Sequence, residues 1–250
     1  MISISDLHVG YQGAVLISDL SVEVETGGIL ALVGASGSGK TTLLRSIAGL
    51  HPPSSGMIRV LEMQPQNLYG AGRLHYLHQS PALWRHLTVQ HHIGLALKLV
   101  GEPIRKRRVG ALVEQLGLGG SEGKYPHELS SGMQARLALA RAFASPPEVL
   151  LIDEPFANLD QLRREGLNEH LQRLRSDARC TIVMVTHDIV EAIRFSTQIL
   201  VFEPGSTHLK ELRPPFGLDI KDPNALPAEA RNFRDKIISL IQGPQPEVLS

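Results

Sequence analysis

Short apolar runs separated by turn residues dominate the first third of the chain. They predict strands over Ser3–Val9, Val15–Val24 and Met57–Leu61. The run Ile29–Val33 is continuously apolar, which is typical of a strand buried on both faces. A glycine-rich turn and a helical stretch over about Lys40–Leu50 follow it.

The middle of the chain has a helical pattern from about Thr88 to Ala144, with breaks at Gly101–Pro103 and Gly117–Gly123. Strand-like runs then return at Val149–Ile152, Thr181–Thr186 and Gln198–Phe202. Strands that alternate with helices predict a mostly parallel sheet covered on both faces. The helical middle is therefore interpreted as an insertion into an α/β core.

The end of the chain differs from both parts. After Phe202 it is rich in proline, and a last helix is predicted with apolar residues at helical spacing. Those residues are Ala230, Phe233, Ile237, Ile238 and Ile241. We expect this stripe to pack on its own domain rather than on a membrane or a partner. The predicted organisation is one main domain over 1–203 and a C-terminal extension over 204–250.

Composition narrows the class of protein. The 250 residues are 42% hydrophobic and 20% charged, as in an ordinary globular protein, and their formal net charge is zero. A balanced charge gives no support to binding of nucleic acid or anionic lipid. No run of 18 apolar residues occurs, and the N-terminus lacks the pattern of a signal peptide. The single cysteine, Cys180, is expected to be a buried thiol.

The glycine-rich turn matches the P-loop pattern G-x-x-x-x-G-K-[ST] between a buried strand and a helix. Its glycines let backbone amides turn inward around an anion, and the helix directs its positive end at phosphates. Lys40 would reach the β- and γ-phosphates and the Thr41 hydroxyl would bind Mg²⁺. An ordinary glycine turn is the alternative. The predicted ATP-binding residues here are Gly34, Ala35, Ser36, Gly37, Ser38, Gly39, Lys40, Thr41 and Thr42.

Two adjacent carboxylates, Asp153 and Glu154, end the apolar run Val149–Ile152. Asp153 would hold Mg²⁺, directly or through water, and Glu154 would polarise the attacking water as a general base. Adjacent acids after a strand are often only a helix cap. The P-loop pattern earlier in the chain favours the catalytic interpretation.

The segment Leu129-Ser130-Ser131-Gly132-Met133-Gln134 directly precedes the helical run Ala135–Ala144 and resembles the signature segment of ABC ATPases. The resemblance implies that Ser130, Ser131 and Gly132 bind the γ-phosphate held by an opposite subunit, at a helix N-terminus. Two positions depart from the family pattern: Ser131 replaces a glycine and Met133 replaces a glutamine. As an isolated string the segment would be a helix cap.

Four other residues fall in the order that the ABC family has. Gln79 resembles the glutamine that contacts the Mg²⁺ site, and His187 resembles the histidine that contacts the γ-phosphate. Asp160, in Asn158-Leu159-Asp160, resembles the residue that contacts the other subunit, and Tyr11 resembles the aromatic that stacks on adenine. Each alone has an ordinary structural interpretation, as a cap, a core side chain or a surface side chain. The resemblance covers about Ser3 to Phe202.

The resemblance implies a P-loop NTPase (RecA-like) α/β core, an N-terminal antiparallel β subdomain and an inserted helical subdomain over about 88–145. It implies an ATPase with ATP and Mg²⁺, with Lys40, Glu154 and His187 as catalytic residues. The implied partners are a membrane permease, a second copy that completes two ATP sites, and indirectly a solute-binding protein, with no nucleic acid. The implied location is the cytoplasmic face of the cell membrane.

Importer subunits of this single-cassette kind are typical of prokaryotes, and the chain most resembles ATPases of nitrate, sulfonate, taurine and bicarbonate uptake. The alternatives are an export or lipoprotein-release system, a soluble ABC ATPase acting on ribosomes or DNA, and a small-molecule kinase.

The segment after Gln79 contains the only tryptophan, Trp84, beside Leu83. Leu83 and Trp84 are predicted to line a groove for the permease. Packing of Trp84 inside its own chain is the alternative.

Overall fold

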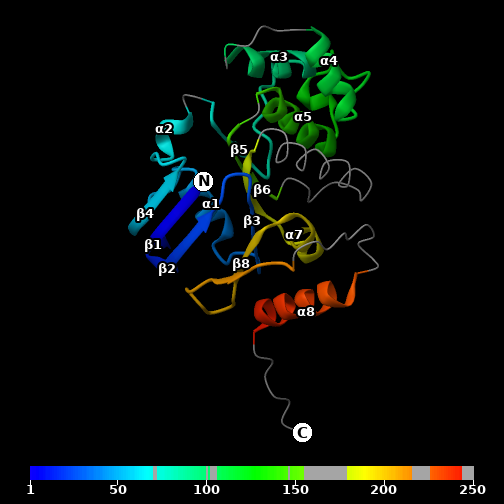
Figure 1. Ribbon diagram of the computed structural model, residues 1–250. Helices are drawn as coiled ribbons and strands as arrows, with labels where there is room; N and C mark the ends of the chain where they lie inside the picture. The colour runs from blue at the N-terminus through cyan, green and yellow to red at the C-terminus, as the bar shows by residue number, and fades with distance from the viewer. Residues whose placement is uncertain are drawn as a thin grey trace. The chain divides into compact units, whose positions relative to one another are not determined.

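The structure of the protein, a computed structural model, describes residues 1–69, 72–99, 101, 106–145, 147–154, 179–215 and 226–243 (Figure 1). The chain forms two compact units, and each is described by itself. Unit 1 comprises Met1–Gln66 and Thr181–Ser250, and unit 2 comprises Asn67–Cys180. Unit 2 is therefore inserted in sequence between the two segments of unit 1.

An antiparallel sheet forms the N-terminal part of unit 1. Its strands are β1 (Ile2–Tyr11), β2 (Ala14–Val24) and β4 (Ser55–Val60), in the order β2-β1-β4. The β1–β2 hairpin turns at Gln12 and Gly13, whose φ angles of 50° and 84° suit a two-residue turn. The antiparallel subdomain predicted from the sequence is confirmed.

The second sheet of unit 1 is mostly parallel and has the order β7-β3-β8-β9. Its strands are β3 (Ile29–Gly34), β7 (Thr181–Val185), β8 (Gln198–Phe202) and β9 (Lys210–Leu212). Every residue of β7 and β8 is buried, as are the first five of β3. The continuous apolar runs therefore do mark strands covered on both faces.

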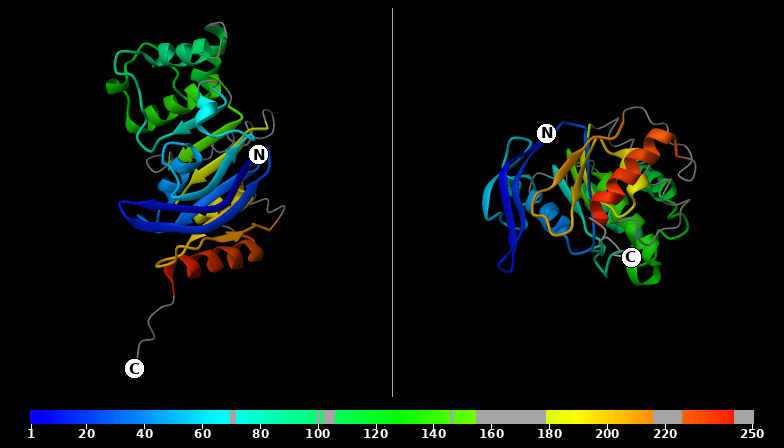
Figure 2. Two further views of the ribbon diagram at one scale, coloured as in Figure 1. Left: turned by 90° about the vertical axis from the view of Figure 1, so that its left-hand side faces the viewer. Right: turned by 90° about the horizontal axis from the view of Figure 1, so that it is seen from below.

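Among the described residues of unit 1, three helices accompany the strands, namely α1 (Lys40–Ile47), α7 (Ile189–Phe195) and α8 (Ala228–Gln242). The last helix packs along α7 and β8, and buries Ala230 and Ile237 there (Figure 2). Its apolar stripe thus packs on its own unit, as the sequence predicts.

Unit 2 combines two strands with most of the helices between them in sequence. Strand β5 (Leu74–Leu77) pairs in parallel with β6 (Val149–Asp153). The helices are α3 (Val89–Leu99), α4 (Lys106–Gln115) and α5 (Ser131–Ala144), with a 3₁₀ turn at Pro126–Glu128 and the short α2 (Gln66–Tyr69) at the boundary. Helix α5 packs against both α3 and α4. In the described residues, no helix combines the length and apolarity that crossing a bilayer requires.

The expected α/β fold class is confirmed, while several element boundaries differ. Helix α1 ends at Ile47 rather than Leu50, because the chain turns at Gly49 with a left-handed φ of 70°. Strands β5 and β9 and helix α7 were not predicted. These elements are three to seven residues long, too short for a clear period.

Candidate functional site

The glycine-rich turn begins where β3 meets β8. Gly34 is paired with Phe202 and has a φ of 154°. A Cβ atom at Gly34 would lie 2.6 Å from the Cβ of Phe202 and 2.8 Å from its carbonyl oxygen. A side chain at this position would therefore displace a central strand, so the turn requires glycine here.

Lys40 is the first residue of α1, and its side chain folds back over the turn. Its Nζ donates to the carbonyl oxygens of Gly34, at 2.9 Å, and Ala35, at 2.7 Å. The residue is only 6% exposed. Gly39, with a φ of 102°, provides the backward bend that makes this possible. The ammonium group is thus held in place by the loop's own backbone.

The turn has features that fit a polyphosphate. The tip at Ala35, Ser36 and Gly37 is exposed, and the chain enters α1 directly after it. The hydroxyl of Ser38 is buried and has no hydrogen-bond partner. An unpartnered buried hydroxyl, a fixed ammonium and a helix N-terminus are the groups that bind phosphate oxygens. Thr41 and Thr42 follow, both half-buried.

His187 lies next to the glycine-rich turn in the topology of unit 1. Strands β3 and β7 are parallel neighbours, with Leu32 opposite Val185, so both segments leave the same edge of the sheet. His187 is exposed there. The next residue, Asp188, caps α7 by accepting from the backbone N–H of Glu191 at 3.0 Å. The helix cap is therefore supplied by Asp188, which leaves His187 on the surface.

Tyr11 ends β1 at the tip of the hairpin and is 49% exposed. Its ring lies 6.0 Å from the ring of His51, with an angle of 44° between the planes. The His51 Nε2 atom forms a 2.8 Å hydrogen bond with the Gly10 carbonyl. An exposed ring face beside a braced backbone suits a stacking role.

In unit 2, the predicted acids and Gln79 follow adjacent parallel strands. Leu77 of β5 is opposite Ile152 of β6, so Gln79 and Asp153 lie at the same edge. Asp153 is buried, and its Oδ2 accepts a 3.1 Å hydrogen bond from the Tyr76 hydroxyl. Glu154 adopts a left-handed φ of 46°, which is uncommon outside glycine. At the end of β6, the carboxylate of Asp153 is therefore held by a hydrogen bond, and the backbone of Glu154 is strained.

The signature segment forms the start of α5. The Ser130 hydroxyl accepts from the backbone N–H of Met133 at 3.3 Å and so caps the helix. Ser130 and Ser131 are exposed and Gly132 is buried. Because Ser131 is an exposed first helical residue, its replacement of the family's glycine causes no steric conflict within the chain.

The predicted residues are divided between the two units. Unit 1 contains Tyr11, the whole glycine-rich turn and His187. Unit 2 contains Gln79, both carboxylates and the signature segment. Asp160 lies outside the described residues.

Trp84 packs within unit 2. Its ring stacks on His92 of α3, with centroids 5.6 Å apart and planes at 21°, and the Arg141 guanidinium lies 4.5 Å from its centroid. The residue remains 39% exposed. Burial, with the Arg141 charge as a smaller cause, lowers the pKa of His92 to about 4, and the same two causes lower the pKa of His75 to about 4. Sequence reasoning gave packing of Trp84 inside its own chain as an alternative, but it did not identify His92 and Arg141 as the partners of Trp84, or Tyr76 as the partner of Asp153.

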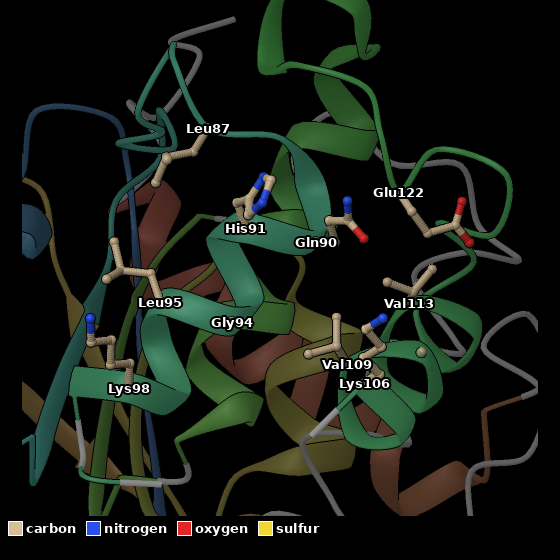
Figure 3. A pocket seen from close by; sticks show the side chains of 11 residues that line it. Leu87, Gln90, His91, Gly94, Leu95, Lys98, Lys106, Val109, Val113 and Glu122 are labelled. Atoms are coloured by element: carbon tan, nitrogen blue, oxygen red, sulfur yellow. The ribbon is translucent and has the colours of Figure 1, made fainter. Parts of the chain in front are cut away.

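A groove of about 720 Å³ lies between α3 and α4 of unit 2 (Figure 3). Leu87, Leu95, Val109 and Val113 supply apolar side chains to its walls. Polar and charged groups line it as well, namely Gln90, His91, Lys98, Lys106 and Glu122. Leu83 and Trp84 are not among the lining residues, so the groove begins further along the chain than the predicted permease-docking residues.

The motifs and the fold together define a P-loop protein of the ABC type. The chain belongs to the ABC transporter family, whose profile matches residues 17–157, more than half of the chain.

Two relatives illustrate the likeness. The sulfate/thiosulfate import ATP-binding protein CysA of Mycolicibacterium paratuberculosis is 40% identical over 210 residues, which are 82% of this chain and 57% of that protein. The Fe(3+) ions import ATP-binding protein FbpC of Pseudomonas fluorescens is 39% identical over 206 residues, 80% of this chain and 58% of that protein. The chain therefore spans less than two thirds of the length of these relatives.

Solved structures show the same fold. An ATP-binding subunit of an ABC transporter has a TM-score of 0.79 at 24% identity, over 97% of this chain and all of that chain. A bacterial ABC transporter cassette solved as a dimer has a TM-score of 0.75 at 25% identity, over 87% of this chain and all of that chain.

Proposed function

We propose that this chain is the ATP-binding and ATP-hydrolysing subunit of an ABC importer that works with a separate membrane permease. The observation that carries the proposal is the glycine-rich turn with Lys40 fixed on its own carbonyls. The names of the relatives, which are import ATP-binding proteins, support the importer class. Likeness to nitrate, sulfonate, taurine or bicarbonate systems stays a prediction.

In this proposal Gly34–Thr42 bind the phosphates of ATP and Tyr11 stacks on the adenine. The Lys40 ammonium moves from the loop carbonyls to phosphate oxygens, a change of acceptor that needs only a side-chain rotation. Ser38 gains a partner for its buried hydroxyl. His187 contacts the γ-phosphate from the neighbouring strand end.

Thr41, Gln79 and Asp153 are the proposed Mg²⁺ ligands, because hydroxyl, amide and carboxylate oxygens are what this ion prefers. When bound, Mg²⁺ would neutralise charge on the β- and γ-phosphates. The Tyr76 hydroxyl orients Asp153 through its bond to Oδ2. A partner that fixes a ligating carboxylate raises the precision of the site.

Glu154 is the proposed general base. Its carboxylate takes a proton from water as the water's oxygen attacks the γ-phosphorus, and the bond from that phosphorus to the bridging oxygen of ADP breaks. Glu154 directly follows Asp153, and its left-handed φ of 46° is a conformation that few residues other than glycine adopt. A strained backbone at this residue is therefore consistent with a positioned base.

A second copy of the chain is the proposed partner at the signature segment. Ser130, Ser131 and Gly132, and Asp160, would contact ATP or the P-loop side of the other copy. The exposure of Ser130 and Ser131 supports a role toward another molecule. Hydrolysis would remove the γ-phosphate contacts that join the copies, which biases a two-state opening and closing.

The groove between α3 and α4 is the proposed docking site for the permease, at the cytoplasmic face of the membrane (Figure 3). Its apolar walls and its exposed Lys98 and Lys106 suit a short amphipathic helix with acidic residues. Reversal of both charges, Lys98→Glu with Lys106→Glu, should weaken co-purification with the permease and leave basal ATP turnover unchanged. The matched control is Lys236→Glu, an exposed lysine of α8. Equal binding by the reversed and control variants would remove this groove from the proposal.

Hydrolysis itself is tested by Glu154→Gln. The amide preserves the shape but cannot accept a proton, so turnover should fall by about 100-fold or more. ATP affinity should be unchanged, and an ATP-bound dimer should accumulate in size-exclusion chromatography. Wild-type turnover in this variant would exclude Glu154 as the base.

An alternative function is that of a soluble ABC ATPase acting on ribosomes or DNA. ATP turnover that is stimulated by nucleic acid and not by the permease would support it.

A further inference from the structure

Arg141 lies in the last turn of α5 and contacts the segment that follows Gln79. Its Nη1 donates to the Ala82 carbonyl oxygen at 2.7 Å, and its guanidinium covers one face of Trp84. His92 covers the ring as well, and its Nε2 lies 3.1 Å from the Trp84 carbonyl oxygen. The guanidinium of Arg141 therefore binds this segment by two interactions, a hydrogen bond to Ala82 and a cation–π contact with Trp84.

The segment 80–87 contains neither a helix nor a strand. Its backbone bonds include two short turns, from Leu83 N–H to the Pro81 carbonyl and from Leu87 N–H to the Trp84 carbonyl. Local turns of this kind open easily unless other contacts fix them. Arg141 and His92 provide such contacts, and they attach the segment to α5 and α3.

Helix α5 links two parts of the proposed ATP site. It begins at the signature segment, where Ser130 is its cap, and carries Arg141 in its last turn. A 14-residue helix is about 21 Å long, and α5 is continuous from Ser131 to Ala144. Any displacement at its first turn is therefore transmitted to Arg141, and from there to the residues directly after Gln79.

We propose that Arg141 is a positioning residue that makes the signature helix and the segment after Gln79 move as one body, and so places Gln79 for hydrolysis. This inference rests on the proposed function. Arginine suits the role because its planar group can donate to a carbonyl and stack on an indole together, which lysine cannot do as well. Burial lowers the pKa of Arg141, and burial together with the Arg141 charge lowers the pKa of the neighbouring His75 and His92 to about 4, so these two side chains are neutral near pH 7.

The activity test is a double-mutant cycle with Gln79. Arg141→Met keeps the volume and loses both interactions, and ATP turnover of the purified full chain should fall about 10- to 100-fold through kcat, with ATP affinity within twofold of wild type. If Arg141 acts through Gln79, the double variant Arg141→Met with Gln79→Ala should lose no more than Gln79→Ala alone. Losses that multiply would overturn the proposal, as would wild-type turnover in Arg141→Met.

The control is Arg108→Met. Arg108 also donates from a helix to a backbone carbonyl of unit 2, at 3.0 Å, but its acceptor is Ala144 of α5 and not a residue of the segment 80–87. Its turnover should stay within twofold of wild type. If both variants lose turnover and melting temperature alike, the role of Arg141 is structural. Arg141→Lys, which keeps the charge over Trp84, should restore part of the activity.

Hydrogen exchange tests the attachment without any activity. In Arg141→Met the amides of Leu83 and Leu87 should exchange several-fold faster, and in Arg108→Met they should not. If wild type hydrolyses no ATP, the proposed function fails, while the exchange result still decides whether Arg141 holds the segment. Unchanged exchange in Arg141→Met would overturn the attachment itself.

Discussion

In the proposed function two helix N-termini contact phosphate, and their structures differ. Helix α1 begins in unit 1 behind a turn whose glycines have positive φ angles and whose lysine is buried on two carbonyls. Helix α5 begins in unit 2 with a serine cap, and both of its first serines are exposed. The first is a closed cradle and the second is an open surface.

The difference indicates how much each helix N-terminus should contribute to the affinity for ATP. A turn that already holds an ammonium group and an unpartnered hydroxyl needs little reorganisation to bind phosphate, so affinity for ATP should depend mainly on unit 1. An exposed capped helix end offers one hydroxyl and a partial positive charge, worth about 0.3–1 kcal/mol in water. It should contribute only when a second molecule excludes water from it.

The largest effect that this comparison predicts is the loss of stability and of ATP binding when Gly34 is replaced. Alanine there would place a Cβ 2.6 Å from Phe202 and strain a positive φ, at a cost on the order of 3 kcal/mol. Gly34→Ala should therefore lower the melting temperature strongly and abolish ATP binding. The matched variant is Gly37→Ala, whose Cβ meets nothing within 4 Å and which should lose about 1 kcal/mol for its φ of 79°. Equal stability of the two variants would show that β8 yields to a side chain.

Acid should lower the stability of unit 2 more than that of unit 1. In the part of the chain that the structure describes, the two histidines with a lowered pKa, His75 and His92, both belong to unit 2. Each is neutral when folded, so the unfolded state binds more protons between pH 6.5 and about 4. Stability must then fall as pH falls through that window, and these groups cause no further loss below it.

Burial lowers the pKa of the His92 imidazole from 6.5 to about 4, so His92 should contribute to this loss of stability as the pH falls. Hydrogen exchange at pH 7 and pH 5 should show unit 2 opening more readily at the lower pH, with a smaller change in unit 1. His92→Gln keeps an amide donor for the Trp84 carbonyl and should remove much of the pH dependence. An unchanged pH profile in that variant would contradict the assignment.

Much of the architecture was predictable because the core strands and the longer helices have clear patterns. The buried runs at Ile29 and Val149 are too apolar for a loop and too short for a helix, and both are strands. The glycine-rich turn was predictable for a similar reason, since only its glycines and lysine suit that pattern of strand, turn and helix.

The remaining features depend on contacts between distant segments. No spacing rule places Phe202 against Gly34, Tyr76 on Asp153, or Arg141 over Trp84. Strand β5 also escaped prediction, because its polar positions are only half-buried and its four residues show no period. Local propensity cannot indicate such tertiary partners.

The smallest expected effects are those of removing the Lys40 and Ser130 side chains, which are proposed to contact phosphate. Lys40→Ala removes the ammonium from the cradle, and a charged hydrogen bond is worth about 1.5–3 kcal/mol, so ATP affinity should fall about 10- to 100-fold.

Ser130→Ala removes a helix cap and should cost about 1 kcal/mol of stability. Its effect on ATP affinity should be absent at protein concentrations where the chain is monomeric, because α5 then has no second copy to contact. Titration with a fluorescent ATP analogue, at low and at high protein concentration, measures both. A loss of monomer affinity in Ser130→Ala equal to that in Lys40→Ala would show that the helix end of unit 2 also binds the nucleotide of its own chain, and would remove the division between a closed cradle and an open surface.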